Sequence, residues 1–201
     1  MIKDEYRSIK NRSRGLYKDR GSKFISIAIP LESEDQVKKL LDEYKKKYHD
    51  ARHHCFAYKL GTDDDEWRVN DDGEPAGTAG NPIMGQIKSF DLSNILIIVI
   101  RYFGGTLLGT GGLIRAYREA ARDALENSQI VKKTIDCTYR LNFPYEAMND
   151  VMKIIKDRNL EQSGQDFGLD CSLTVRFRAS LEDEITGRFR MVDKLVFIKT
   201  Y

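Results

Sequence analysis

The stretch that decides the fold around it runs from residue 101 to residue 118 and reads Arg101-Tyr-Phe-Gly-Gly-Thr-Leu-Leu-Gly-Thr-Gly-Gly-Leu-Ile-Arg-Ala-Tyr-Arg118. The apolar and mostly β-branched run Ile95–Ile100 precedes it, and such a run is typical of a strand buried on both faces. After the glycines, apolar residues recur at helical spacing from Leu113 to Ala124. The stretch therefore predicts a buried strand, a glycine-rich loop and an amphipathic helix.

The loop contains five glycines, namely Gly104, Gly105, Gly109, Gly111 and Gly112. Glycine loses more backbone entropy on folding than other residues, so this cluster indicates unusual backbone angles or a close approach of another group. A loop that opens directly into a helix also leaves free N–H groups at the positive end of the helix dipole. Two interpretations remain open: contact with a phosphate or phosphodiester, and a tight turn that packing requires.

The glycine loop lacks both common nucleotide-binding fingerprints. A Walker A loop needs a lysine after its last glycine, but Leu113 stands there. A dinucleotide-binding pattern that starts at Gly109 needs a third glycine where Ile114 stands. The arginines are better placed for phosphate, because Arg115 and Arg118 fall in one band of the predicted helix and Arg101 precedes the loop. Pairing with acids at helical spacing is the alternative for the helical arginines.

A second unusual segment, Asn70–Gly80, is a polar loop with three carboxylates, Asp71, Asp72 and Glu74. Oxygen ligands of this kind suit Mg²⁺, and a carboxylate can also act as a general base. The dipeptide Asp72-Gly is equally a turn signal. A magnesium site, a general base and a solvated turn are therefore the alternatives, and we expect no cofactor other than this possible Mg²⁺.

A third segment, His53–Leu60, predicts a strand on which His53 and Cys55 share one face. Structural zinc needs about four ligands, and the other cysteines lack Cys-x-x-Cys spacing. A Cys55 nucleophile with His53 as its base lacks a third, orienting group. We favour a half-buried polar strand face that lines a groove. Trp67, the only tryptophan, is either a stacking platform for a base or a residue at the rim of the core.

The pattern restarts after about residue 130. Strands and helices then alternate in the order β-α-β-β-α-β, which is the ferredoxin-like pattern. We therefore predict an α+β protein with an N-terminal domain over residues 1–130 and a ferredoxin-like domain over residues 137–201.

The composition predicts a cytoplasmic protein that does not span a membrane. No apolar run approaches the roughly 20 residues that a membrane helix needs, and the first six residues lack the apolar core of a signal peptide. Three distant cysteines, an odd number, favour free thiols in a reducing compartment. The net charge is +2, but residues 1–23 hold eight Lys or Arg against three acids. That segment suits nucleic acid or an acidic partner, or else an edge hairpin protected by its lysines.

Three motifs occur in order: His53-x-Cys-x-Ala57, Asp71-Asp-Gly-Glu-Pro-x-Gly-Thr78-Ala-Gly80 and the glycine stretch from Arg101 to Tyr117. Together they strongly resemble the YigZ/IMPACT family. The resemblance implies an N-terminal domain with the fold of the second domain of ribosomal protein S5. It also implies a C-terminal domain similar to the last domain of elongation factor G. Eukaryotic members regulate translation under amino-acid stress, whereas bacterial members have no established reaction.

We expect the three motifs to line one groove and to bind RNA or a ribosomal or translation partner without catalysis. A phosphate-handling or nucleotide-handling enzyme and a protein-interaction module are the alternatives, and the oligomeric state stays open. The residues expected to form the binding site are His53, Cys55, Asp71, Asp72, Glu74, Thr78, Arg101, Gly104, Gly105, Gly109, Gly111, Gly112, Arg115 and Arg118.

Overall fold

The computed structural model describes residues 4–61 and 66–200, and these form a mixed α/β protein with several sheets. The described chain divides into two compact units, the first of which spans residues 6–133. The second unit comprises residues 4–5 together with residues 134–200.

The first unit is built on an antiparallel sheet with the strand order β2-β3-β6-β4-β5. Its elements are β1 (Glu5–Ile9), β2 (Ser13–Asp19), β3 (Ser22–Pro30), α1 (Glu34–Lys47), β4 (His53–Lys59), β5 (Trp67–Asn70), α2 (Gly80–Ser89), β6 (Ile95–Tyr102), α3 (Gly109–Glu126) and β7 (Ile130–Thr134). Strand β1 pairs with β7 in a separate two-stranded sheet.

The second unit has the element order β-α-β-β-α-β that the sequence predicts. Its elements are β8 (Asp136–Pro144), α4 (Met148–Asp157), β9 (Glu161–Phe167), β10 (Asp170–Arg178), α5 (Glu182–Arg190) and β11 (Val196–Thr200), with single turns of 3₁₀ helix before α4 and α5. The four strands form one antiparallel sheet in the order β11-β8-β10-β9. Alternate residues of β8 and β10, such as Leu141 and Leu173, are buried in its core.

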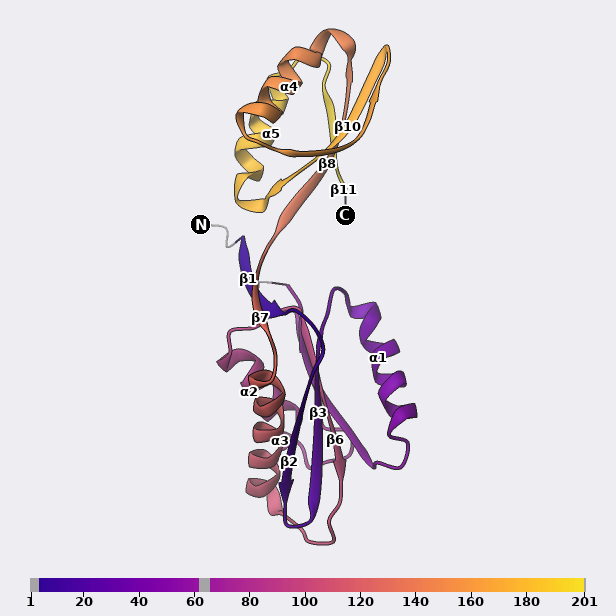
Figure 1. The fold of residues 1–201 in the computed structure, drawn as a ribbon, viewed down its shortest axis with the longest axis vertical. Helices are drawn as coiled ribbons and strands as arrows, with labels where there is room; N and C mark the ends of the chain where they lie inside the picture. The colour runs from indigo at the N-terminus through magenta and orange to yellow at the C-terminus, as the bar shows by residue number, and fades with distance from the viewer. Residues whose placement is uncertain (1–3, 62–65, 201) are drawn as a thin grey trace. The chain divides into compact units, whose positions relative to one another are not determined.

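Strand β6 is the centre of the first unit, and every residue from Ile95 to Ile100 has no exposed surface. One face of the sheet packs against α1, where Ile98 and Ile100 join Tyr44 in one core cluster. The other face packs against α2 and α3, as Figure 1 shows. The predicted burial on both faces is confirmed, although the sheet is antiparallel.

Helix α3 lies close to the sheet because its inward residues are small. The Ser13 hydroxyl donates to the Ala124 carbonyl at 2.7 Å, and the Ser26 hydroxyl donates to the Ala120 carbonyl at 2.5 Å. A Cβ atom on Gly15 of β2 would lie 2.4 Å from the backbone nitrogen of Ala124. This close approach fixes the C-terminal half of α3 against β2 and β3.

The three cysteines are free thiols, as predicted, and all three are buried. Among the helices in the described ranges, none is long and apolar enough to cross a membrane.

Substituting Gly15 by alanine will test the packing of α3 on β2. The added Cβ would overlap the α3 backbone, so we expect Gly15→Ala to lower the free energy of unfolding by about 1–3 kcal/mol. Gly85→Ala in α2 is the matched control, because an added Cβ there meets no described atom within 4 Å. We expect the control to raise stability by about 0.5–1 kcal/mol. Urea denaturation measures both, and equal effects would contradict this account.

Candidate functional site

The three sequence motifs meet at one end of the five-stranded sheet. Strands β4 and β6 are antiparallel, and His53 at the start of β4 stands opposite Arg101 at the end of β6. Strand β5 runs antiparallel to β4, with Asn70 opposite Phe56, so the acidic loop that follows β5 returns to the same end. Hydrogen bonds join the three motifs to one another at the place where the sequence predicts a groove.

A buried ion pair joins the glycine motif to the acidic loop. The Arg101 Nη1 and Glu74 Oε1 atoms lie 2.6 Å apart, and the two side chains are only 7% and 3% exposed. The Tyr117 hydroxyl of α3 donates to the same Glu74 oxygen at 2.7 Å. Burial of a charge is costly unless the charge is paired, so these contacts hold the loop against β6 and α3.

The Arg101 guanidinium also lies over two aromatic rings. Its Cζ atom is 5.5 Å from the ring centroid of Phe24 and 5.7 Å from that of Phe103. Phe24 is fully buried, whereas Phe103 is 51% exposed. Arg101 thus connects the interior of the unit to an aromatic ring at its surface.

The Asp71 carboxylate organises the acidic loop from within. It accepts hydrogen bonds from the backbone N–H groups of Gly77 at 2.8 Å, Ala79 at 3.0 Å and Gly80 at 2.8 Å. Gly80 begins α2, so the carboxylate stabilises the start of that helix. The buried Thr78 hydroxyl likewise donates to the Pro75 carbonyl at 2.7 Å within the loop.

His53 and Cys55 face the acidic loop together, as the strand pattern predicts. The His53 Nδ1 atom lies 2.8 Å from the Asp72 carbonyl oxygen. The Cys55 Sγ atom lies 3.0 Å from the Asp71 carbonyl oxygen and 3.3 Å from the Tyr117 hydroxyl. Burial raises the pKa of the Cys55 thiol above its usual range. A nucleophilic cysteine needs the opposite shift, so these surroundings suit a structural thiol.

The carboxylates of the acidic loop have protein partners. Asp71 binds backbone amides, Glu74 binds Arg101 and Tyr117, and Asp72 Oδ2 accepts the His54 N–H at 2.6 Å. Within the described ranges, no group of three or more His, Cys, Asp or Glu side chains is arranged to hold a metal ion. The magnesium hypothesis stays a prediction, and these contacts favour a structural role for the loop.

Different structural constraints explain the glycines of the loop. A Cβ on Gly104 would lie 1.9 Å from the carbonyl carbon of Gly21, so close backbone approach explains that position. Gly105 and Gly109 have φ angles of +88° and +70°, which L side chains rarely adopt. Neither reason applies to Gly111, because a Cβ there meets no described atom within 4 Å. A Cβ on Gly112 would touch the Leu108 side chain at 3.0 Å.

The segment Phe103–Gly112 is largely exposed, and together with Arg115 and Arg118 of α3 we call it the glycine-loop surface. No described side chain caps the N-terminus of α3, whose first turn contains no acid. Its first backbone N–H groups therefore have no partner within the helix.

The cations of this surface differ in how they are paired. Arg115 forms a 3.3 Å ion pair with Asp19. Arg118 is exposed, and within the described chain it has no hydrogen-bond or ion-pair partner. Lys18 and Lys23 stand directly opposite each other on β2 and β3, and Lys23 stands opposite Tyr102. Tyr102 packs against the core cluster on the α1 side, so strand alternation puts both lysines on the face of the sheet opposite α3.

Comparisons with known proteins match the region that contains these motifs. The family described as Impact N-terminal domain matches residues 20–125, which include all three motifs. The chain belongs to the IMPACT family. It is 30% identical over 181 residues to IMPACT family member YigZ of Escherichia coli strain K12, with 85% of this chain and 89% of the relative covered. It is 32% identical over 177 residues to an IMPACT family member of Haemophilus influenzae, covering 83% and 86% of the two chains.

Other comparisons extend the likeness to eukaryotes and to a solved structure. Protein IMPACT of Rattus norvegicus is 34% identical over 96 residues, which are 45% of this chain and 30% of the rat protein. A crystal structure described as that of a hypothetical protein matches with a TM-score of 0.73 and 25% identity, covering 100% of this chain and 99% of the other. The two-unit architecture is thus shared with a known fold.

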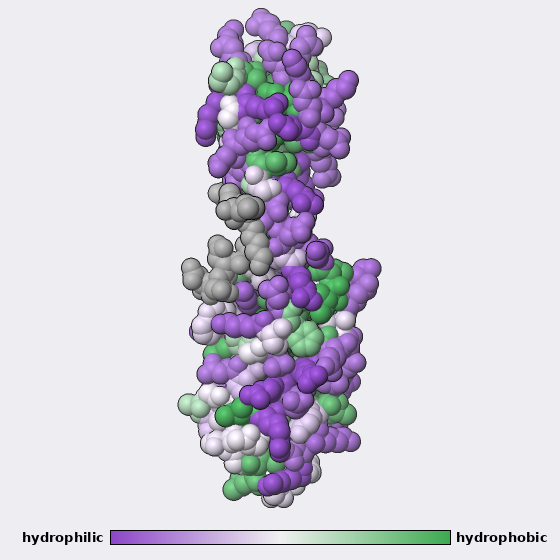
Figure 2. Space-filling view, turned by 90° about the vertical axis from the view of Figure 1, so that its left-hand side faces the viewer, coloured by the Kyte–Doolittle hydropathy of each residue, from purple (hydrophilic) through white to green (hydrophobic). Residues whose placement is uncertain are grey.

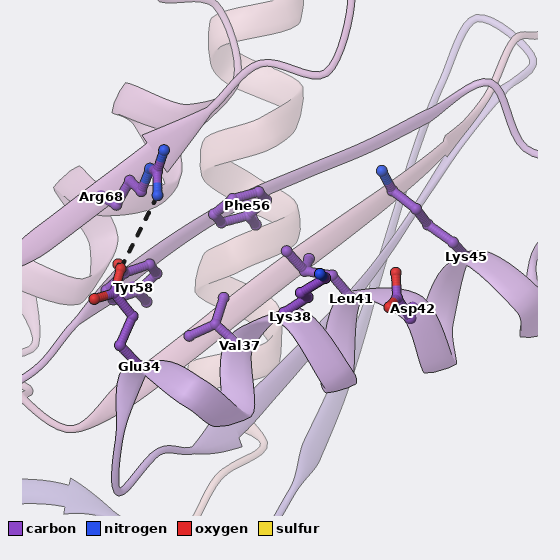
Figure 3. Close-up of a pocket in the computed structure, with 9 residues that line it drawn as sticks. All are labelled: Glu34, Val37, Lys38, Leu41, Asp42, Lys45, Phe56, Tyr58 and Arg68. Carbon is purple, nitrogen blue, oxygen red and sulfur yellow. Dashed lines mark hydrogen bonds and ion pairs between the residues drawn. The ribbon is translucent and has the colours of Figure 1, made fainter.

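A pocket of about 380 Å³ lies between α1 and strands β4 and β5. Figure 3 shows Val37, Leu41, Phe56 and Tyr58 around it, with charged side chains at its rim. Sequence reasoning missed this pocket, because the packing of α1 beside β5 is a tertiary contact with no local sequence signal. On the face drawn in Figure 2, hydrophilic residues predominate and hydrophobic residues form separate areas.

Replacing Glu74 by glutamine will test the buried ion pair. The Arg101 charge would remain buried without its counter-charge, so we expect Glu74→Gln to lower the free energy of unfolding by roughly 3–5 kcal/mol. Glu126→Gln removes the exposed partner of Arg122 and should change stability by less than about 1 kcal/mol. Urea denaturation compares the two variants. A Glu74→Gln variant as stable as the control would show that the pair does not hold the motifs together.

Alkylation by iodoacetamide will test the state of the Cys55 thiol. Because burial raises its pKa and removes it from solvent, we expect labelling at pH 8 only after the protein is unfolded. Peptide mapping by mass spectrometry identifies the labelled cysteine. Labelling of native Cys55 at the rate of a free thiol would revive the nucleophile hypothesis.

Proposed function

We propose that this protein is a non-enzymatic cytoplasmic factor associated with the regulation of translation, and that its glycine-loop surface binds RNA. The observation that supports this proposal is the exposed and uncapped start of α3, a helix that also carries the exposed Arg115 and Arg118. Phosphate oxygens bind arginine and lysine side chains and free backbone N–H groups. RNA offers such oxygens at every nucleotide.

The electrostatics of the surface support an anionic partner. Asp19 forms an ion pair with Arg115 of this surface, so these two charges balance each other. Arg118 is exposed on the helix that the loop opens, and within the described chain it has no ion-pair partner. A phosphate can pair with this guanidinium, which gives the site a reason to bind that does not depend on base sequence.

Family membership supports the link to translation. The resemblance implies translational regulation by eukaryotic members, and the two units fit modules that occur in translation proteins. The strand order β11-β8-β10-β9 is consistent with a ferredoxin-like fold for the second unit. We propose the fold of the second domain of ribosomal protein S5 for the first unit, whose sheet order is β2-β3-β6-β4-β5.

The structure favours this function over the enzyme alternative. An enzyme that uses Asp71, Glu74 or Cys55 needs a group free to accept a proton or to attack a substrate. In the structure the two carboxylates bind partners within the loop and at Arg101, and the thiol is buried. The exposed residues of the motifs include several glycines and Arg115, which suit binding.

Salt-dependent binding of a short fluorescent oligouridylate will test the proposal. We expect affinity to fall linearly with salt concentration on a double-logarithmic plot, because bound phosphates release counterions. Arg118→Ala should reduce the slope by about 0.7, the value for one phosphate contact on a single strand. Arg122→Ala is the matched control on the same helix, because Arg122 pairs with Glu126. Fluorescence polarisation measures the affinity at each salt concentration.

Two outcomes of that experiment would count against the proposal. Absence of binding at low salt would overturn RNA binding altogether. Equal slopes for the wild type, Arg118→Ala and Arg122→Ala would show that RNA binds elsewhere on the molecule.

A further inference from the structure

One aromatic side chain of the glycine-loop surface stands apart from the other exposed apolar residues. Phe103 is 51% exposed and directly precedes Gly104 and Gly105. The exposed Trp67 has the Lys88 ammonium 5.2 Å from its ring centroid and lies on β5. Phe103 therefore combines an exposed ring with the cations of the glycine-loop surface.

The ring of Phe103 packs against a side chain that is itself held in place. The Arg101 guanidinium covers it with Cζ 5.7 Å from the centroid, and the buried Phe24 ring also lies against that guanidinium. Arg101 is fixed in turn by its 2.6 Å pair with Glu74. A ring that rests on a fixed and buried cation loses little further freedom when a ligand binds, which favours affinity.

The loop that follows this ring has open space around three of its glycines. A Cβ added to Gly105, Gly109 or Gly111 would meet no described atom within 4 Å. The absence of side chains lets a flat group approach the loop backbone closely.

We propose that Phe103 is a stacking platform for an unpaired nucleotide base, so that the glycine-loop surface selects single-stranded over double-stranded RNA. This inference rests on the proposed function and names the form of RNA that the site takes. Stacking needs a base with a free face, and duplex bases already stack on each other. The neighbouring cations bind the phosphates that flank the stacked base.

The chain provides a matched control for an exposed phenylalanine. Phe167 at the end of β9 is 48% exposed, close to the value for Phe103. Its surroundings are acidic, because Asp166 precedes it and Asp170 follows the turn. Carboxylates repel phosphates, so Phe167 should contribute nothing to RNA binding.

The experiment measures oligouridylate and duplex RNA binding to the full chain at low salt. We expect Phe103→Ala to weaken oligouridylate binding about tenfold, within the range for one stacked base. Phe103→Tyr should retain affinity, because a tyrosine ring stacks as well, and Phe167→Ala should match the wild type. Duplex RNA should bind more weakly than the oligouridylate and with no change in Phe103→Ala. Thermal unfolding confirms that each variant is folded.

A fluorescence measurement reports stacking directly. Trp67→Phe removes the only tryptophan, and Phe103→Trp then places a single fluorophore in the loop. We expect oligouridylate to quench its emission, because a stacked base contacts the indole. If oligouridylate binds with salt dependence but Phe103→Ala keeps wild-type affinity and Phe103→Trp is not quenched, this inference fails while the proposed function stands. If no RNA binds the wild type, both fail.

Discussion

The buried ion pair between Arg101 and Glu74 is the contact on which the site depends. It joins the end of the central strand to the acidic loop, and Tyr117 brings α3 to the same carboxylate oxygen. Two charges are stable inside a protein only when each remains the partner of the other. The pair therefore holds together three segments that are far apart in the sequence.

This arrangement divides the motif residues into two groups. Arg101, Glu74, Asp71 and Cys55 contact other protein groups and give the end of the sheet its shape. The glycine-loop surface is exposed, and its side chains are neutral or cationic. The neighbouring acid Asp19 forms an ion pair with Arg115. A rigid interior beneath an open cationic surface suits a binding protein better than a catalyst, because catalysis needs reactive groups within reach of a substrate.

Periodicity in the sequence was sufficient to predict the main elements. The apolar run before the glycines predicts a strand buried on both faces, and the structure places Ile95–Ile100 at the centre of the sheet. The shared face of His53 and Cys55 follows from strand geometry alone, and both contact the acidic loop. The restart after about residue 130 likewise predicts the element order of the second unit.

The sequence could not predict which group within the protein each charged side chain pairs with. Arg101 and Arg118 read alike as phosphate ligands, yet Arg101 pairs with Glu74, 27 residues away, while Arg118 faces solvent. Asp71 reads as a metal ligand but binds the start of α2. The pairing of β1 with β7 and the pocket beside α1 also depend on tertiary contacts. Such choices are set by the whole fold, because a charge pairs with whichever group burial brings near.

Native-state hydrogen exchange of the wild type and Glu74→Gln tests the central claim most directly. The amides of Gly77, Ala79 and Gly80 donate to Asp71 inside a loop that the ion pair holds in place. The account predicts that they are protected in the wild type and exchange together and much faster in the variant, at a pH and temperature where both proteins are folded. The amides of β6 should remain protected in both. Unchanged protection of the loop in the variant would contradict the claim that the Arg101–Glu74 pair holds the site together.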